Sequence, residues 1–393
     1  MIYLVILFLL LILSIHYDIC EKTRNRVFWE SLILLIFVLL AGLRWRLGID
    51  TTRYLDTYYH DLPTIDKFSF EDYPLMRSPL YYLLCSLVKT VGGRYYIIQI
   101  IESLFVNTLI FKYIKKHSSY FFTCLLFYFL IYYTIYNMET MRASFGIAIC
   151  LFGNDYIKDR KWLKGYLLYL VAFLFHYQFL ILLLLPLLSF IKLDFKGIII
   201  LFAALVVGYI ASVRLGDYIQ LFEINEKMSE KATQYGESDD FGARELSLWS
   251  IILVKVPPIF MLVWAILYVK RNNHSSDFAK IESFAMFGLI FSMIQFSIQI
   301  IYRFVEIYAI YFVLYYAEFF CSLAKSQKLS RSLALSRSII LFIPLFYSVA
   351  LNNLRSNFRY YPYSSVIERR IDKNRELRYK QEEQTPSANI NEY

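Results

Sequence analysis

The chain has 393 residues, of which 58% are hydrophobic and only 19% are charged. This apolar share is far above that of a soluble domain, and the charges lie in clumps between apolar runs. The pattern is typical of an all-α polytopic integral membrane protein, whose helices satisfy their backbone polar groups internally. The alternating pattern of an outer-membrane barrel is absent from the sequence, which argues against that class.

The net charge of +9 and the five cysteines do not indicate a soluble function. In a soluble protein such a charge would suggest nucleic acid. Here the surplus Lys and Arg fall in short loops, as they do on the cytoplasmic side of membrane proteins, so we expect no nucleic-acid partner. The cysteines have neither metal-ligand nor disulfide spacing, and we expect no metal and no other cofactor.

The apolar runs predict about 12 membrane-spanning helices, with a range of 10–14. The first run has no cleavage site and no basic residue before it, so we expect a retained span and not a signal peptide. The predicted spans are residues 2–16, 28–43, 95–111, 119–136, 142–157, 164–176, 178–191, 197–213, 248–269, 281–301, 304–324 and 338–351.

The basic loops between these spans set the topology, because Lys and Arg favour the cytoplasmic side. To keep all of them on that side, residues 79–91 must not cross, and we predict a re-entrant or interfacial helix there. Residues 163–191 must cross twice and turn near His176, since one helix over this segment would be about 43 Å long.

This topology predicts a transmembrane domain over residues 1–351 with two long outward loops, 44–94 and 214–247. The remainder, residues 352–393, is predicted to be a mostly disordered polar tail, because it holds few apolar residues. The outward loops and span ends share one group of chemically useful side chains, namely Arg44, Arg46, Asp50, Arg53, Arg142, His176 and Arg303.

Residues 42–59, GLRWRLGIDTTRYLDTYY, are here called the arginine knot. If a helix starts at Thr51, Asp50 is a good N-cap. Backbone N–H groups at that helix start, with Arg46 and Arg53 beside them, would suit a phosphate. The alternative for Arg44 and Arg46 is that they anchor the preceding span at the interface.

Arg142, Arg303 and His176 lie at the outer ends of predicted spans. An arginine inside a membrane is costly unless it is paired, so both arginines are functional candidates. The alternatives are pairing of Arg142 with Glu139 and of Arg303 with Glu306. His176 is a candidate general base, or else a polar group that is simply satisfied at the interface.

Glu102 and Lys255 each lie roughly 10 Å inside a predicted span, about seven residues from its outer end. Because a lone buried charge is costly, the sequence predicts a buried ion pair between them. Pro257 and Pro258 follow Lys255 and predict a kink in that helix. The pair has a structural role in the simplest interpretation.

Several segments resemble the EpsG family of Wzy-like polysaccharide polymerases. The run RWRLGIDTTRYLDTYY is similar to that family's arginine, glycine and aspartate signature. The stretch that begins ETMRASFG and continues to AFLFHYQF resembles its arginine-led span, basic turn and A-x-x-F-H segment. Arg303 lies where the family carries a late arginine, and the YYPY at residues 360–363 is similar to its C-terminal Pro-Tyr element.

The resemblance implies a multi-pass enzyme of the bacterial plasma membrane whose active face is outward. Such an enzyme joins repeat units linked to undecaprenyl pyrophosphate, in capsular or exopolysaccharide biosynthesis. Arg46, Arg142 and Arg303 would neutralise the pyrophosphate leaving group. Apart from the resemblance, Arg44 and Arg53 are further candidates for binding the pyrophosphate because they lie in the knot. His176 and Asp50 would deprotonate or orient the acceptor hydroxyl.

The implied partners are the lipid bilayer, undecaprenyl-pyrophosphate-linked oligosaccharides, and a chain-length regulator and a flippase of the same pathway. Two alternatives to a polymerase stay open, namely an O-antigen-type ligase and a transporter that flips the lipid-linked units. A transporter favours charges along a path at the bilayer midplane and repeat symmetry. Here the charges gather at one face, which favours an enzyme.

Overall fold

The computed structural model describes residues 2–48, 50–183, 191–213, 249, 251–272, 276–326, 330–355 and 360–367. The predicted loop 214–247 and the tail from residue 368 lie outside these residues. The described residues form no strand, only one isolated bridge between Arg44 and Ser365. The all-α fold class is therefore confirmed.

The first half of the described chain contains α1 (Ile2–Leu13), η1 (Ser14–Ile19), α2 (Arg26–Gly42), α3 (Asp50–Asp56), η2 (Thr57–Asp61), η3 (Ile65–Lys67), η4 (Leu75–Arg77), α4 (Pro79–Thr90), α5 (Tyr95–His117), α6 (Phe121–Ile131), η5 (Ile135–Glu139), α7 (Met141–Lys158), α8 (Trp162–Phe175) and η6 (Tyr177–Leu183). The second half contains α9 (Phe195–Val213), η8 (Ile251–Lys255), α13 (Val256–Asn272), α14 (Ser276–Gln295), η9 (Gln299–Ile301), α15 (Tyr302–Ala324) and α16 (Arg331–Arg355).

Seven helical segments of the described residues are long and apolar enough to cross a membrane: Ile2–Ile19, Tyr95–His117, Phe195–Ser212, Ile251–Asn272, Phe278–Gln295, Gln299–Ala324 and Ser332–Leu351. The chain is thus a multi-pass membrane protein. The count of about 12 spans stays a prediction. Two further helices, α6 and α8, are apolar but too short to be included among the seven. A helix, α4, does form over the predicted re-entrant segment, but its depth in a membrane also stays a prediction.

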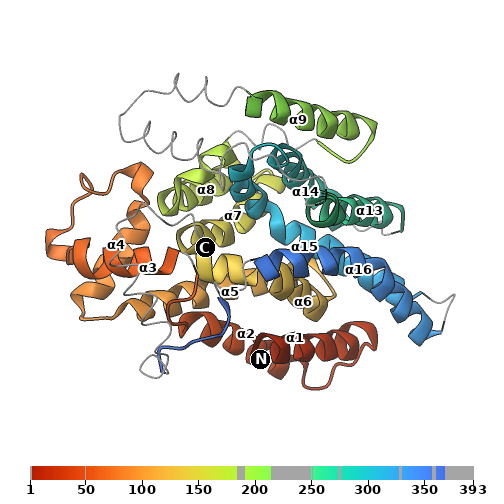
Figure 1. Ribbon diagram of the computed structural model, residues 1–393, viewed down its shortest axis with the longest axis horizontal. Coiled ribbons are helices and arrows are strands. Elements are labelled where there is room, and N and C mark those ends of the chain that lie inside the picture. The colour runs from red at the N-terminus through yellow and green to blue at the C-terminus, as the bar shows by residue number, and fades with distance from the viewer. Residues whose placement is uncertain are drawn as a thin grey trace.

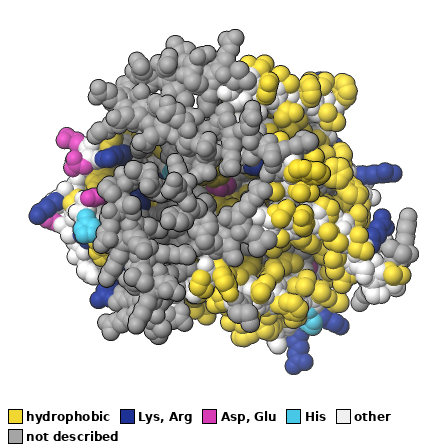
Figure 2. All heavy atoms as spheres, in the orientation of Figure 1, with side chains coloured by type: hydrophobic (Ala, Val, Ile, Leu, Met, Phe, Trp, Pro, Cys, Tyr) yellow, Lys and Arg dark blue, Asp and Glu magenta, His cyan; other side chains and the backbone are white. Residues whose placement is uncertain are grey.

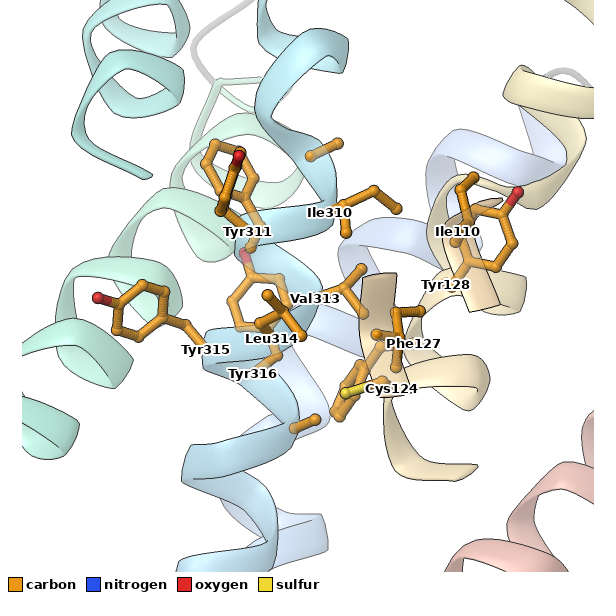
Figure 3. Close-up of a cluster of buried hydrophobic side chains, with 14 of the residues drawn as sticks. Ile110, Cys124, Phe127, Tyr128, Ile310, Tyr311, Val313, Leu314, Tyr315 and Tyr316 are labelled. Atoms are coloured by element: carbon orange, nitrogen blue, oxygen red, sulfur yellow. The ribbon is translucent and has the colours of Figure 1, made fainter. Parts of the chain in front are cut away.

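Helix α15 is the centre of the bundle, with α6, α13, α14 and α16 packed around it (Figure 1). Its aromatic side chains fill the core, and Figure 3 shows how they meet those of α6. The ring centroids of Tyr316 and Phe127 lie 5.8 Å apart. Tyr315 donates a hydrogen bond to the Phe278 carbonyl at 3.0 Å, so this buried hydroxyl has a partner. A tyrosine-rich core is favourable where its polar tips are satisfied in this way.

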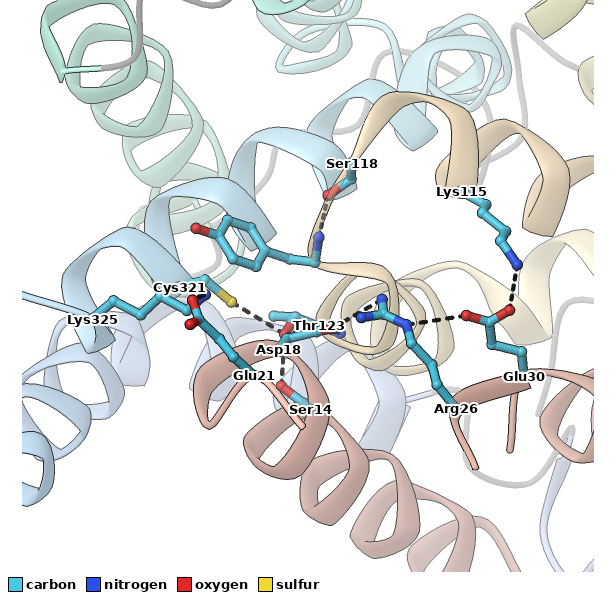
Figure 4. Close-up of polar contacts among 11 residues, drawn as sticks. Ser14, Asp18, Glu21, Arg26, Glu30, Lys115, Ser118, Thr123, Cys321 and Lys325 are labelled. Carbon is cyan, nitrogen blue, oxygen red and sulfur yellow. Dashed lines mark hydrogen bonds and ion pairs between the residues drawn. The ribbon is translucent and has the colours of Figure 1, made fainter. Parts of the chain in front are cut away.

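The predicted basic loops meet at one end of the bundle, here called the basic end. Lys325 pairs with Glu21 at 2.6 Å, and Lys115 pairs with Glu30 at 2.5 Å (Figure 4). Asp155, which is buried, binds Lys116 at 2.6 Å and His117 at 2.8 Å. Lys270 and Glu282 form a further ion pair of this end, at 3.0 Å. These contacts join loops that the topology assigned to one side.

The segment around His176 turns as the sequence predicts. Helix α8 follows the basic turn at residues 158–161 and ends at Phe175, and His176 then has extended backbone angles. By Leu193 the chain is back at the basic end, where its N–H donates to Glu282 at 2.8 Å. His176 therefore lies at the opposite end of the bundle from Leu193.

At this opposite end, here called the arginine end, the knot rests on the turn that precedes α7. Gly48 has a φ of +95°, and a Cβ at this position would lie 2.1 Å from the Met138 carbonyl oxygen. Tyr136, in the same turn, donates a hydrogen bond to the Glu306 carbonyl of α15. The knot, the start of α7 and the start of α15 are thereby held together.

On the right-hand side of the face shown in Figure 2 the described side chains are mainly hydrophobic, and several Lys and Arg side chains project at the outline of the molecule. Phe8 of α1 and Phe202 of α9 are 68% and 67% exposed. Apolar exposure of this extent on long helices is expected for surfaces that face lipid. The surface therefore agrees with a membrane-embedded bundle whose charged groups lie at its two ends.

We predict that the two ends lie on opposite sides of the membrane. Arg53 at the arginine end and Lys22 at the basic end are both exposed. In a Cys20→Ser background, a membrane-impermeant maleimide should label only one of the variants Arg53→Cys and Lys22→Cys in intact cells. Permeabilised cells should show both. Labelling of both in intact cells would contradict the topology.

A second prediction concerns the contact of the knot. Gly48→Ala should lower the melting temperature of the purified protein more than Gly92→Ala does. Gly92 also has a positive φ, of +72°, but a Cβ added there would meet no atom within 4 Å. Gly92→Ala therefore costs only backbone strain of about 1 kcal/mol, whereas Gly48→Ala must also displace Met138. Equal melting temperatures would show that the contact is unimportant.

Candidate functional site

The arginine knot is tied to the C-terminal part of the described chain. Trp45 donates its backbone N–H to the Ser364 carbonyl at 2.9 Å, and Val366 donates to the Leu43 carbonyl at 2.8 Å. This pairing of residues 43–45 with 364–366 is here called the strap. The predicted tail therefore contains an ordered piece, because its backbone groups have partners in the knot.

Arg44 points into the bundle. Its side chain is fully buried, and Nη1 donates to the Ala41 carbonyl at 2.6 Å. A fully buried guanidinium has no access to a substrate outside the bundle. Its burial therefore argues against both predicted roles of Arg44, in binding pyrophosphate and in anchoring a span at the interface, because both need contact with the surface.

Arg46 is oriented differently, because the backbone reverses at this residue. Its φ is +51°, in the left-handed region, and its guanidinium carbon lies 4.9 Å from the centre of the Trp45 ring. The side chain is half-buried. Stacking on an indole ring engages the face of a guanidinium, whereas hydrogen bonds to an anion form at its edge, so the two are compatible.

The predicted helix after the knot is present as α3, which starts at Asp50, one residue before the predicted start. The side chain of Asp50 lies outside the described residues, so its N-cap and catalytic roles stay predictions. Arg53 is exposed on α3. It lies at the arginine end with the rest of the knot.

Arg142 lies against the tyrosines of the knot and α4. Its Nε donates to the Tyr54 hydroxyl at 3.2 Å, and its guanidinium carbon is 5.3 Å from that ring's centre. The Tyr54 ring in turn packs 5.8 Å from that of Tyr81. Arg142 therefore contacts Tyr54, and its predicted alternative, pairing with Glu139, stays a prediction.

A small cavity lies beside Arg142, lined by the tyrosines Tyr54, Tyr58, Tyr81 and Tyr95 among others. Its volume is about 10 Å³. A space of this size holds one water molecule and no sugar. Arg142 thus contacts Tyr54, one of the tyrosines that line this cavity.

Two features position His176. Phe179, three residues later, packs on Gly146 of α7 so closely that a Cβ there would lie 2.1 Å from the ring. This contact brings the turn onto α7, one helical turn from Arg142. His176 is 8% exposed, and its Nδ1 accepts the Gln178 N–H at 3.3 Å.

The electrostatic neighbours of His176 are Arg142 and Arg303. Burial lowers the pKa of His176, and the positive charges of the two arginines lower it further. The imidazole is therefore neutral at ordinary pH. Because Nδ1 accepts a hydrogen bond, the proton of the neutral ring lies on Nε2, which makes Nε2 a donor.

Arg303 opens α15 at the same end. Its guanidinium carbon lies 5.9 Å from the centre of the Tyr302 ring. Its charge also acts on Glu306, as does the charge of Glu139. The charge of Arg303 therefore reaches both His176 and Glu306, and its predicted pairing with Glu306 stays a prediction.

The predicted ion pair of Glu102 with Lys255 does not form. Lys255 Nζ donates to Gln299 Oε1 at 3.4 Å. Glu102 is fully buried, neither of its oxygens has a hydrogen-bond partner, and the charge that acts on it is that of Arg44. Depth within a span does not say which side chains of neighbouring helices face each other.

The sequence did not indicate three residues that shape this end, namely Tyr54, Trp45 and Gly146. Each acts through a contact with a distant segment, and single aromatic or glycine residues are common in such chains.

The described residues contain no group of three His, Cys, Asp or Glu side chains suited to a metal.

Comparison with known proteins gives one finding. A family model described as the EpsG family matches residues 27–365, which is most of the chain. The match ends at Ser365, the residue that pairs with Arg44 in the strap. No curated protein and no solved structure matches the chain. The chain belongs to the EpsG family, the family of Wzy-like polysaccharide polymerases.

Proposed function

We propose that this protein polymerises lipid-linked oligosaccharide repeat units at the outer face of a bacterial plasma membrane. It transfers the growing glycan from undecaprenyl pyrophosphate to a sugar hydroxyl of the next unit. Family membership supports a role in polysaccharide polymerisation in general. The lipid-pyrophosphate donor, the membrane face and the residue roles are parts of the proposal.

One arrangement carries the proposal: the turn of the buried His176 packs through Phe179 on Gly146, one helical turn after Arg142 on α7. The charges of Arg142 and of Arg303 on α15 both reach this ring. Three segments far apart in sequence thus bring two cations near one polar ring. Arg46 adds a third cation at the same end. Guanidinium groups suit the oxygens of a diphosphate, and fixed cations stabilise the charge that develops on such a leaving group.

In the proposed reaction the acceptor hydroxyl oxygen attacks the anomeric carbon of the donor sugar. The bond from that carbon to the phosphate oxygen breaks, and its electron pair leaves with the pyrophosphate. The hydroxyl proton passes to a base. Diphosphate is already a good leaving group, so the protein needs mainly to supply cations and to orient the acceptor.

The hydrogen bond at Nδ1 gives His176 a more specific part in the proposal. With its proton on Nε2, the ring donates a hydrogen bond to the acceptor oxygen or to a phosphate oxygen, and so orients it. Asp50 is then the candidate base. A bound diphosphate would offset the field of Arg142 and Arg303 and raise the pKa of His176 toward its usual range.

The arginine roles are testable by substitution. Arg142→Ala and Arg303→Ala should each reduce chain extension by about a hundredfold or more, because each removes a cation from the leaving group. Arg77→Ala is the matched control, since Arg77 is an exposed arginine at the same end. Polymer length in cells and protein level in membranes should be measured together. Long polymer in both variants would overturn the proposed clamp.

The histidine role has its own test. His176→Gln should retain part of the activity, because its amide N–H₂ can replace the Nε2 donor, whereas His176→Ala should lose it. His60→Ala, at an exposed histidine of the same end, should behave as wild type. Equal loss in the Gln and Ala variants would instead assign the proton transfer to His176.

Glycan analysis of a deletion strain separates polymerisation from the alternatives. A polymerase defect should leave single repeat units on the outer side. A ligase defect should leave long chains on the lipid carrier, and a flippase defect should leave single units on the cytoplasmic side. Either of the last two results would contradict the proposal.

A further inference from the structure

The buried charges at the arginine end include one couple that the proposed function leaves unexplained. Arg44 and Glu102 are both 0% exposed. Two of the guanidinium nitrogens, Nε and Nη2, and both carboxylate oxygens of Glu102 have no hydrogen-bond partner. Four polar atoms without partners inside an apolar bundle would be very costly.

The two side chains act on each other without direct contact. The charge of Arg44 is the one that acts on Glu102, and the same charge also reaches Tyr95. Helices α2 and α5 are in tight contact beside them, since a Cβ on Gly42 would lie 2.9 Å from the Ile100 Cα. A bridging water would give partners to the orphan atoms and join the two side chains.

Arg44 is also the inner residue of the strap. It forms the bridge with Ser365, and its neighbour Trp45 bonds Ser364 at 2.9 Å. Trp45 carries Arg46 on its ring, 4.9 Å from the guanidinium carbon. A contact that holds the Arg44 side chain inside the bundle therefore also fixes the backbone that positions Arg46.

We propose that Glu102 is a positioning residue. Through a water-bridged contact with Arg44 inside the bundle, it anchors the strap and thereby sets the place of Arg46 at the diphosphate. This inference rests on the proposed function for the role of Arg46. It makes Arg44, and not Lys255, the partner of Glu102, and it gives the fully buried Arg44 a structural role.

The test compares Glu102→Gln with Glu102→Asp in purified, reconstituted full-length protein. The probe is the lipid-linked repeat unit isolated from the deletion strain. Glu102→Gln keeps the shape but replaces one carboxyl oxygen by an N–H₂ donor, which cannot accept from the bridging water or the guanidinium. Its KM for this probe should rise about tenfold while kcat changes little. Glu102→Asp keeps the carboxyl group, and a water spans the added gap, so it should restore most of the wild-type KM.

Glu282→Gln is the matched control, because Glu282 is a buried carboxylate paired with Lys270 at the basic end. It should leave the KM unchanged. A normal KM in Glu102→Gln would overturn the positioning role. The role would also be overturned if the only effect in both Gln variants were a smaller amount of folded protein.

A second measurement does not depend on activity. Spin labels at Arg53→Cys and Ile367→Cys, in the Cys20→Ser background, report the distance from α3 to the strap. Both sites are exposed. The distance distribution should broaden in Glu102→Gln and not in Glu282→Gln, and an unchanged distribution would overturn the anchor. If the wild-type protein extends no chain from the probe but the distance distribution still broadens in Glu102→Gln, the proposed function fails. The anchoring role of Glu102 would then still hold.

Discussion

The arginine end depends on a backbone pairing between two segments from opposite parts of the chain. Residues 43–45 and 364–366 exchange hydrogen bonds at 2.9 and 2.8 Å. Without this strap the start of the knot would lose its tie to the second segment and keep its contact with the Met138 turn. With it, the chain after α2 is fixed from two sides, which allows Arg44 to point inward and Arg46 to lie on Trp45.

Lys116 at the basic end and Arg142 at the arginine end have different kinds of partner. At the basic end Lys side chains are paired with acidic ones, as in Lys116 with Asp155. At the arginine end Arg142 meets the ring and hydroxyl of Tyr54 instead. A carboxylate cancels the charge of a cation, whereas a neutral tyrosine leaves that charge to act on its surroundings. This difference suits the surroundings of Arg142 to an anionic ligand.

The arrangement also bears on the kind of function. The cations of the candidate site gather at one end of the bundle. A carrier of lipid-linked units favours charges along a path at the bilayer midplane. Glu102 and Arg44, which are buried near this end, contact each other through water and serve the strap in our proposal. The candidate site at this end is, in the same proposal, a surface that holds a diphosphate during a transfer.

The sequence alone determined the fold class, the shared end of the basic loops and the turn near His176. Hydropathy and the Lys and Arg bias decide these features, and both are properties of composition along short windows. The sequence also predicted that Arg46, Arg142, His176 and Arg303 lie at one end. The number of spans between two residues decides whether they lie on the same side of the membrane.

Only the tertiary structure decided which charges meet. The sequence paired Glu102 with Lys255 from their depth, but depth says nothing about which helix faces which, and the charge that reaches Glu102 on α5 is that of Arg44. Likewise the sequence treated Arg44 and Arg46 alike, although the left-handed backbone at Arg46 sends them in different directions. Orientation around a helix and pairing across the chain arise from packing, and no local window of sequence contains them.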